Sequence, residues 1–182
     1  MQNIEILRTA LENLSDENNY LFSIRSFHSL FPKLSKPALA MLLSRAAAKG
    51  ILSHICKGYY LYQKANYERG YELFQLAAHL REGCFCYLSL ENILSEAGII
   101  SQIPTNYVSF MTNGRSGKIN CGNFGIIEFV HTKKNISALS EHLVYERKSK
   151  IWKADVCLAY KDMVNAKRPL DLIDEEILHE FI

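Results

Sequence analysis

The chain has 182 residues, of which 48% are hydrophobic, and 21 Lys or Arg stand against 19 Asp or Glu. This composition is typical of a globular protein with one large or two small domains, and it excludes a disordered chain. No segment approaches the ~20 apolar residues that span a bilayer. Residues 1–14 are not an apolar run behind positive charge, so no signal peptide is expected. We expect a cytoplasmic protein without membrane contact.

The positive charge is concentrated in the N-terminal third. Between Glu17 and Glu68 there is no Asp or Glu, although the interval contains seven basic residues: Arg25, Lys33, Lys36, Arg45, Lys49, Lys57 and Lys64. A segment of one charge sign is typical of a surface that contacts a polyanion. We interpret this segment as the part of the chain that contacts DNA.

The first elements are short and amphipathic. Residues 2–15 predict a helix whose buried stripe is Ile4, Leu7, Leu11 and Leu14. Residues 20–22 predict an edge strand that pairs with a later hairpin. Residues 24–31 predict a second helix, ended by Pro32, with a buried side formed by Ile24, Phe27, Leu30 and Phe31.

A third helix is predicted between Ser35 and Gly50. The Ser35 hydroxyl can cap the first turn, Pro37 falls where a missing N–H costs nothing, and Gly50 suits the left-handed exit. The predicted buried stripe is Leu39, Leu42, Leu43 and Ala46. The opposite face has small or basic side chains, which suit a helix entering the major groove: Lys36, Ala40, Met41, Ser44, Arg45 and Ala48.

A β-hairpin follows, formed by residues 51–56 and 59–62 around the turn Lys57-Gly58. With the preceding helices it predicts a winged helix-turn-helix domain over residues 1–64. We assign phosphate contacts to Lys36, Arg45, Lys49 and Lys57. Nearest the bases we place Ser35, Ala40, Met41 and Ser44, and Arg45 could contact either a phosphate or a base. Tyr59 is a possible hydrogen-bonding neighbour on the wing.

Residues 65–182 predict a small mixed α/β domain, so the whole chain belongs to the α+β class. Helices are expected at 72–81, 90–97, 136–143 and 152–165, with Ser89 capping the second of them and a short acidic helix, capped by Asp171 or Asp174, near the C-terminus. Strands are expected at 85–88, 107–112, 119–121 and 125–131, and residues 113–118 predict a hairpin tip.

Other candidate chemistry is weaker. The five cysteines and six histidines match no metal-ligand spacing, so neither a metal nor another cofactor is expected. Cys84 or Cys121 with His131 is the only nucleophile and base pair we consider. One basic group is interpreted as a solvated rim: Arg115, Lys118, Lys133 and Lys134. A second, around Trp152, is interpreted as a patch for a phosphate backbone or an acidic partner: Arg147, Lys148, Lys150 and Lys153.

The run CYLSLENILSEAGIISQIP from Cys86 to Pro104, followed by YVSFMTNGRSGKI and GIIEFVH, resembles the AbiEi family of antitoxins from bacterial type IV toxin-antitoxin systems. In that family these elements follow an N-terminal winged helix, and a phrase like G-x-I-E-F-x-H recurs. The segment KADVCLAYKD stands where the family has a helix with a phrase like P-E-K-A-L-L-D, but this chain lacks the Pro-Glu pair.

The resemblance implies a transcriptional autorepressor that binds repeats in its own promoter and counteracts a nucleotidyltransferase toxin without a stable complex. The DNA-reading helix would be residues 35–49, with Lys57 on the wing, and we expect a monomer or weak dimer. Two alternatives remain: an interaction module that docks an acidic partner or the toxin without specific DNA binding, and an enzyme with an unrecognised site in the C-terminal region.

Overall fold

The computed structural model describes residues 2–101 and 106–182, so Pro104 of the resembling run lies outside the described residues. The chain is mixed α and β and divides into two compact units, with the division between Gly70 and Tyr71. Among the described residues, every helix is too short or too polar to cross a membrane.

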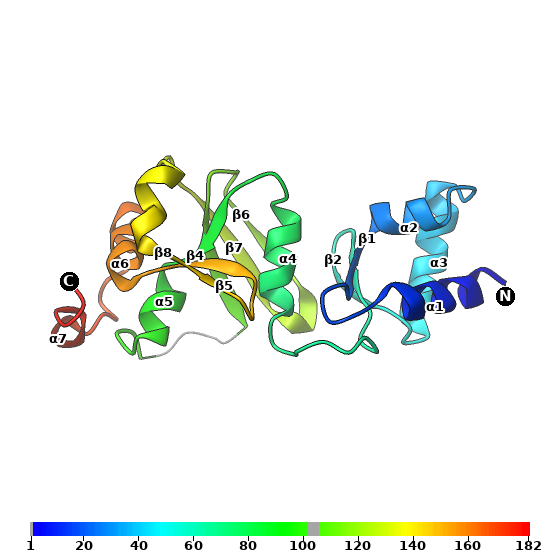
Figure 1. The fold of residues 1–182 in the computed structure, drawn as a ribbon, viewed down its shortest axis with the longest axis horizontal. Helices are drawn as coiled ribbons and strands as arrows, with labels where there is room; N and C mark the ends of the chain where they lie inside the picture. Colours follow the sequence, from blue (N-terminus) through cyan, green and yellow to red (C-terminus); the bar gives the residue numbers. More distant parts are fainter. Residues whose placement is uncertain (1, 102–105) are drawn as a thin grey trace. The chain divides into compact units, whose positions relative to one another are not determined.

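The first unit contains three helices and a small antiparallel sheet (Figure 1). Its elements are, in order, α1 (Gln2–Leu14), β1 (Leu21–Ser23), α2 (Ile24–Leu30), α3 (Lys36–Ala48), β2 (Ser53–Cys56) and β3 (Tyr59–Leu61). The strands lie in the order β1-β3-β2. The predicted edge strand at residues 20–22 is confirmed, because Leu21 pairs with Leu61 of the hairpin.

Apolar side chains from all three helices form the core of this unit. The fully buried ones include Leu7, Leu11, Phe27, Leu39, Leu43 and Ala46. The predicted burial is wrong for Leu14 and Ile24, which are 51% and 41% exposed. Each of these residues lies at the end of its helix, beyond the turns that the core covers.

The first unit extends further than the predicted boundary after Lys64. The backbone N–H of Tyr62 donates to the carbonyl of Tyr20 at 2.9 Å. The rings of Tyr20 and Tyr67 stack with centroids 3.8 Å apart, and the Arg69 guanidinium lies over the Tyr67 ring. These contacts hold residues 62–70 on the first unit, so the division falls after Gly70.

The second unit is built on a six-stranded sheet in the order β6-β7-β5-β4-β9-β8. Its helices are α4 (Glu72–Leu80), α5 (Glu91–Glu96), α6 (Val156–Asn165) and α7 (Glu175–Leu178), with 3-10 segments η1 (Gly122–Phe124) and η2 (Ile136–His142). The strands are β4 (Cys86–Leu88), β5 (Tyr107–Thr112), β6 (Gly117–Asn120), β7 (Ile126–His131), β8 (Leu143–Glu146) and β9 (Ile151–Ala154).

Helices cover both faces of this sheet (Figure 1). On one face, α4 packs Phe74 against Phe110, and the Arg81 guanidinium lies 3.9 Å from the centre of the Phe129 ring. Tyr87 lies on the other face, because its register partner Met111 is adjacent to Phe110 in β5 and side chains alternate along a strand. Helix α6 lies on that face, next to Tyr87.

Residues 113–118 do not form the predicted hairpin tip. β5 pairs with β7 in parallel, and β6 pairs antiparallel with the far side of β7. The chain therefore crosses over the end of β7 between β5 and β6. Neighbouring strands hold this crossing: the Ser116 hydroxyl accepts from the His131 N–H, and the Asn113 side-chain oxygen accepts from the Phe85 N–H.

The predicted helix at residues 152–165 begins later, at Val156. Residues 151–154 instead form β9, which pairs with β8 on one side and β4 on the other. Asp155 caps the helix by accepting from the Leu158 N–H at 2.7 Å. Asp174 caps α7 in the same way, which confirms the second of the two caps considered.

The prediction that Ser89 caps α5 is wrong. Its hydroxyl instead donates to the carboxylate of Asp162 at 2.8 Å. Asp162 is fully buried in α6 and also accepts from the Tyr87 hydroxyl and from Lys134 Nζ, at 3.0 and 2.7 Å. Three donors from distant parts of the chain thus meet on one carboxylate. This cluster attaches α6 to the sheet.

Removing that carboxylate should destabilise the second unit. Asp162→Ala leaves two buried hydroxyls without their acceptor and Lys134 without its counter-charge, a loss of about 3 kcal/mol in the free energy of unfolding. Urea denaturation followed by the fluorescence of Trp152, the only tryptophan, reports on this unit. The exposed Asp171→Ala is the control, and equal midpoints for both variants would contradict the role of Asp162.

Candidate nucleic-acid interface

Helix α3 has the predicted capping residues at both ends. The Ser35 hydroxyl accepts from the Ala38 N–H, Pro37 lies in the first turn, and Gly50 leaves the helix at φ +65°. The predicted stripe is buried: Leu39, Leu42, Leu43 and Ala46. Because the stripe occupies one side, the opposite side of α3 faces solvent along its whole length.

All the predicted contact residues of α3 lie on that exposed side. Those exposed are Ser35, Lys36, Ala40, Met41, Ser44, Arg45 and Lys49. Ser44 lies near the centre of the face, between small neighbours, whereas Lys36 and Arg45 lie at its two edges, as the helical repeat requires. Small side chains at the centre and charges at the edges allow a close approach to a groove lined by phosphates.

A groove of about 460 Å³ runs along one edge of this face. Met41, Arg45 and Lys49 line it from α3, and Gln2 and Asn3 line it from the start of α1. Sequence analysis had assigned no contact to α1. No signal in the sequence could have identified these two residues, because only the packing of α1 beside α3 brings them next to Arg45.

The turn between β2 and β3 carries Lys57. Its side chain is exposed, and Gly58 follows with φ +82°, which a side chain would disfavour. The carbonyl of Gly58 accepts from the Ile24 N–H at 2.8 Å, so the turn is held against the start of α2. Tyr59 is half-buried and pairs with Ser23 across the sheet.

The charges of this face are not neutralised within the chain. Among the described residues, no carboxylate forms an ion pair with Lys36, Arg45, Lys49 or Lys57. The first unit carries nine Lys or Arg against five Asp or Glu. The field of these cations therefore extends into solvent and attracts anions.

The second basic patch is smaller than predicted, because Lys153 is not part of it. Its ammonium pairs with Glu96 at 2.9 Å and Glu146 at 3.0 Å, and its side chain is 18% exposed. Burial alone would lower the pKa of Lys153, but these two carboxylates outweigh it and raise the pKa. Arg147 and Lys148 are exposed in the β8–β9 turn, and Lys150 is half-buried there.

The predicted solvated rim is wrong for Lys134 but not for Lys118, whose side chain is 61% exposed. Lys134 pairs with the buried Asp162, and Lys118 Nζ lies 3.5 Å from Glu128. Both carboxylates come from parts of the sequence far from the lysine they bind. Only Arg115 and Lys133 of the four remain outside such pairs in the described part of the chain.

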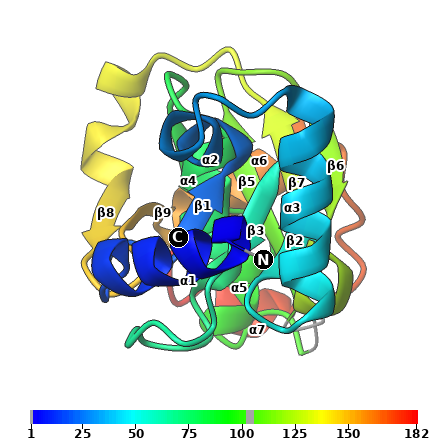
Figure 2. The same cartoon turned by 90° about the vertical axis from the view of Figure 1, so that its right-hand side faces the viewer.

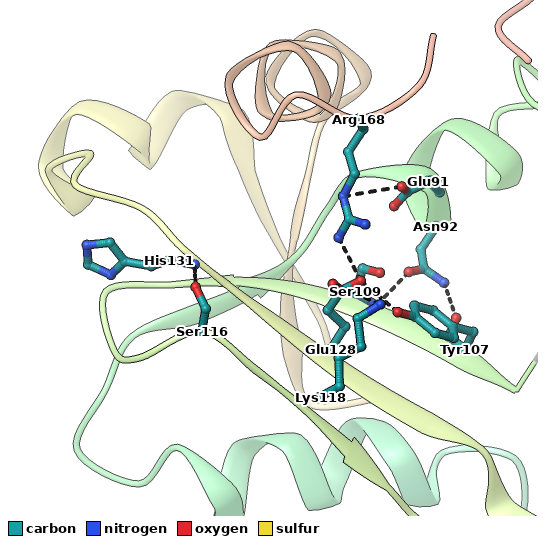
Figure 3. Close-up of polar contacts among 9 residues, drawn as sticks. All are labelled: Glu91, Asn92, Tyr107, Ser109, Ser116, Lys118, Glu128, His131 and Arg168. Atoms are coloured by element: carbon teal, nitrogen blue, oxygen red, sulfur yellow. Dashed lines mark hydrogen bonds and ion pairs between the residues drawn. The ribbon is translucent and has the colours of Figure 1, made fainter. Parts of the chain in front are cut away.

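A polar cluster on the second unit was missed by the sequence analysis (Figure 3). At its centre Glu128, 7% exposed, accepts from the Tyr107 hydroxyl at 2.8 Å and from Arg168 at 2.6 Å. Arg168 also lies 3.5 Å from Glu91, and the Asn92 amide bonds the backbone of β5. The only signal in the sequence was Glu128, an acidic residue within an apolar strand.

The Glu128 carboxylate is saturated by donors. Burial alone would raise its pKa, but the hydrogen bonds from Tyr107 and Arg168, with the charges of Arg168 and Lys118, hold the pKa below the ordinary 4.5. The group is therefore ionised at neutral pH and occupied as an acceptor. This arrangement joins β5, β7 and the segment after α6.

The structure separates Cys121 from His131, whereas Cys84 and His131, the other pair considered, both lie beside Gly114. Cys121 donates its N–H to Gly125, at the opposite end of β7 from His131. The His131 ring lies 2.8 Å from the Gly114 carbonyl. Burial raises the pKa of Cys86 to about 11, so that thiol is protonated at neutral pH.

Comparison with protein-family models and with curated proteins found no match for this chain.

The Glu128 cluster should make stability depend on pH in one direction. A carboxylate whose pKa is lowered by folding stabilises the fold above its unfolded pKa, and the effect is lost as pH falls through the folded value. Glu128→Gln should therefore cost about 2 kcal/mol at pH 7 and progressively less below pH 4.5. Urea denaturation followed by Trp152 fluorescence measures this difference. A pH-independent difference would contradict the assignment, and the exposed Glu82→Gln is the control.

Proposed function

We propose that the chain is a sequence-specific DNA-binding autorepressor whose first unit is a winged helix-turn-helix. The observation that carries the proposal is the exposed face of α3, where basic side chains that pair with no carboxylate of the described residues flank small ones. This is the combination that a major groove between two phosphate backbones admits.

The order of elements supports a winged helix. Helices α2 and α3 follow each other through a short turn, and the β2–β3 hairpin pairs with β1 to form a three-stranded sheet. In this proposal α3 is the recognition helix and the hairpin is the wing. Lys57 at the tip of the wing contacts a phosphate beside the groove that α3 enters.

The exposed side chains divide into two roles. Lys36, Lys49 and Lys57 bind phosphates and set the position of the domain on the duplex. Ser44 lies at the centre of the face and reads a base edge. Arg45 lies within reach of a phosphate or a base edge. Gln2 and Asn3 beside it add hydrogen-bonding groups at the same edge of the face.

The proposed regulatory role comes from the resemblance to AbiEi antitoxins. The phrase GIIEFVH falls on β7, where Glu128 anchors the second unit. We propose that the DNA bound is the chain's own promoter and that the chain counteracts a nucleotidyltransferase toxin. A neighbouring nucleotidyltransferase gene would support this role, and deletion of the chain without any change in expression of its own operon would contradict it.

Binding to the duplex upstream of the chain's own gene, compared with a scrambled duplex by fluorescence anisotropy, tests DNA recognition. Binding should be tight on the first duplex, weak on the second, and lost in Arg45→Ala. Weak and equal binding to both would mean that the face attracts anions without reading sequence. The alternative of an acidic protein partner would then be favoured.

Salt dependence tests which cations contact phosphates. With about four phosphate contacts, log affinity should fall with log salt at a slope of about −3 to −4, and Lys57→Ala should flatten the slope by about one. Lys161→Ala removes the same charge from an exposed position on α6 and should leave the slope unchanged. A slope unaltered by Lys57→Ala would exclude Lys57 from the interface.

A further inference from the structure

Strands β8 and β9 form a hairpin at one edge of the six-stranded sheet (Figure 2). Tyr145 of β8 stands opposite Trp152 of β9, and the two rings lie edge to face with their centroids 5.3 Å apart. Both side chains remain accessible to solvent, at 46% and 41% exposure. Aromatic side chains contribute to stability mainly by burying their large area, so packing alone does not account for this exposed pair.

The aromatic pair stands on one face of the sheet. Trp152 is in register with Tyr87 of β4, so the rings of Tyr145 and Trp152 project from the face that carries α6. Tyr87 is fully buried there, whereas the covering elements leave the two edge strands open. An edge-to-face contact occupies one face of one ring only. The pair therefore presents flat aromatic surface to solvent.

Cations follow the aromatic pair directly. The turn that begins two residues after Tyr145 contains Arg147 and Lys148, which are both exposed. A rise of about 3.4 Å per residue places the start of this turn about 7 Å from Tyr145. Glu146 lies between them, but its side chain points to the opposite face of the sheet and pairs there with a lysine of β9 at 3.0 Å. Glu141 precedes β8, at the end away from the turn.

We propose that the β8–β9 hairpin binds a single strand of nucleic acid. An unpaired base stacks on the pair formed by Tyr145 and Trp152, and Arg147 and Lys148 bind the neighbouring phosphates. Aromatic side chains beside a basic surface are the combination with which proteins hold single strands without reading their sequence. Every base has a flat face and every nucleotide has a phosphate, so this site requires no particular sequence.

The exposed rings favour a single strand over the other polyanions that the basic turn would attract. A duplex keeps its bases stacked on one another, so it offers phosphates to Arg147 but no base to Trp152. The carboxylates of an acidic polypeptide would likewise pair with the cations and leave the rings unused. The inference uses residues of the second unit only, and it does not rest on DNA reading by α3.

Trp152 is the only tryptophan of the chain, so its fluorescence reports on stacking at this site and not on binding elsewhere. A mixed-sequence single strand of about ten nucleotides, titrated into the full chain as DNA and as RNA, should quench this fluorescence saturably. Quenching by either strand supports the proposal. An abasic strand of the same length retains the phosphates and should quench far less. Absence of quenching by both base-containing strands, or equal quenching by the abasic strand, would overturn the proposal.

Substitutions at Tyr145 test the stacking. Tyr145→Ala removes one ring and should raise the Kd for the single strand, measured by quenching of Trp152, by about tenfold. Tyr145→Phe keeps the ring and should bind like the wild type. Phe181→Ala removes an aromatic side chain that is 49% exposed near the C-terminus and should leave the Kd unchanged. A Tyr145→Ala variant with the affinity of the wild type would contradict stacking on this pair.

The salt dependence of quenching tests the basic turn. Arg147→Ala should flatten the slope of log affinity against log salt by about 0.7, whereas Lys161→Ala, at an exposed position on α6, should leave it unchanged. An unaltered slope in Arg147→Ala would overturn the role of the turn. A polyglutamate peptide that displaces the strand at equal charge concentration would identify an acidic polypeptide as the occupant instead. Arg45→Ala should leave the quenching unchanged, so failure of this site and failure of duplex recognition by α3 are distinguishable.

Discussion

The burial of one side of α3 is the constraint on which the functional account depends. Leu39, Leu43 and Ala46 are essentially inaccessible to solvent, and rotating the helix would expose them. Their packing therefore decides which residues face outward. Because the spacing of the apolar residues is fixed by the helical repeat, the same three side chains determine that Ser44 lies at the centre of the exposed face and that Lys36 and Arg45 lie at its edges.

The two units handle charge differently. In the second unit the buried carboxylates of Glu128 and Asp162 are matched by Arg168 and Lys134, and these two pairs help to hold the helical segments to the sheet. In the first unit the core is apolar and aromatic, and the cations of α3 form no ion pair with a carboxylate in the described part of the chain. A polyanion is therefore attracted chiefly by the first unit, even though the net charge of the whole chain is only +2.

Local signals in the sequence were sufficient for α3, for its cap at Ser35 and for its exposed face. They were also sufficient for the positions, although not the pairing, of β5 and β7. The errors concern features set by distant residues. Residues 152–154 of β9 were taken for the start of a helix, β8 was not predicted, and Lys153 was placed in a surface patch although Glu96 lies beside it. Ser89 was expected to cap a helix but bonds Asp162 instead. Such partners are brought together only by the tertiary fold.

Mapping amide chemical-shift changes on the full chain during titration with the upstream duplex tests the central claim most directly. We predict that the changes concentrate at residues 35–49 and at Lys57 and Tyr59, with smaller ones at Gln2 and Asn3. Little change is expected in the sheet of the second unit. Changes confined to residues 71–182, or none on α3 while the duplex is bound, would contradict the assignment of α3 as the DNA-reading element.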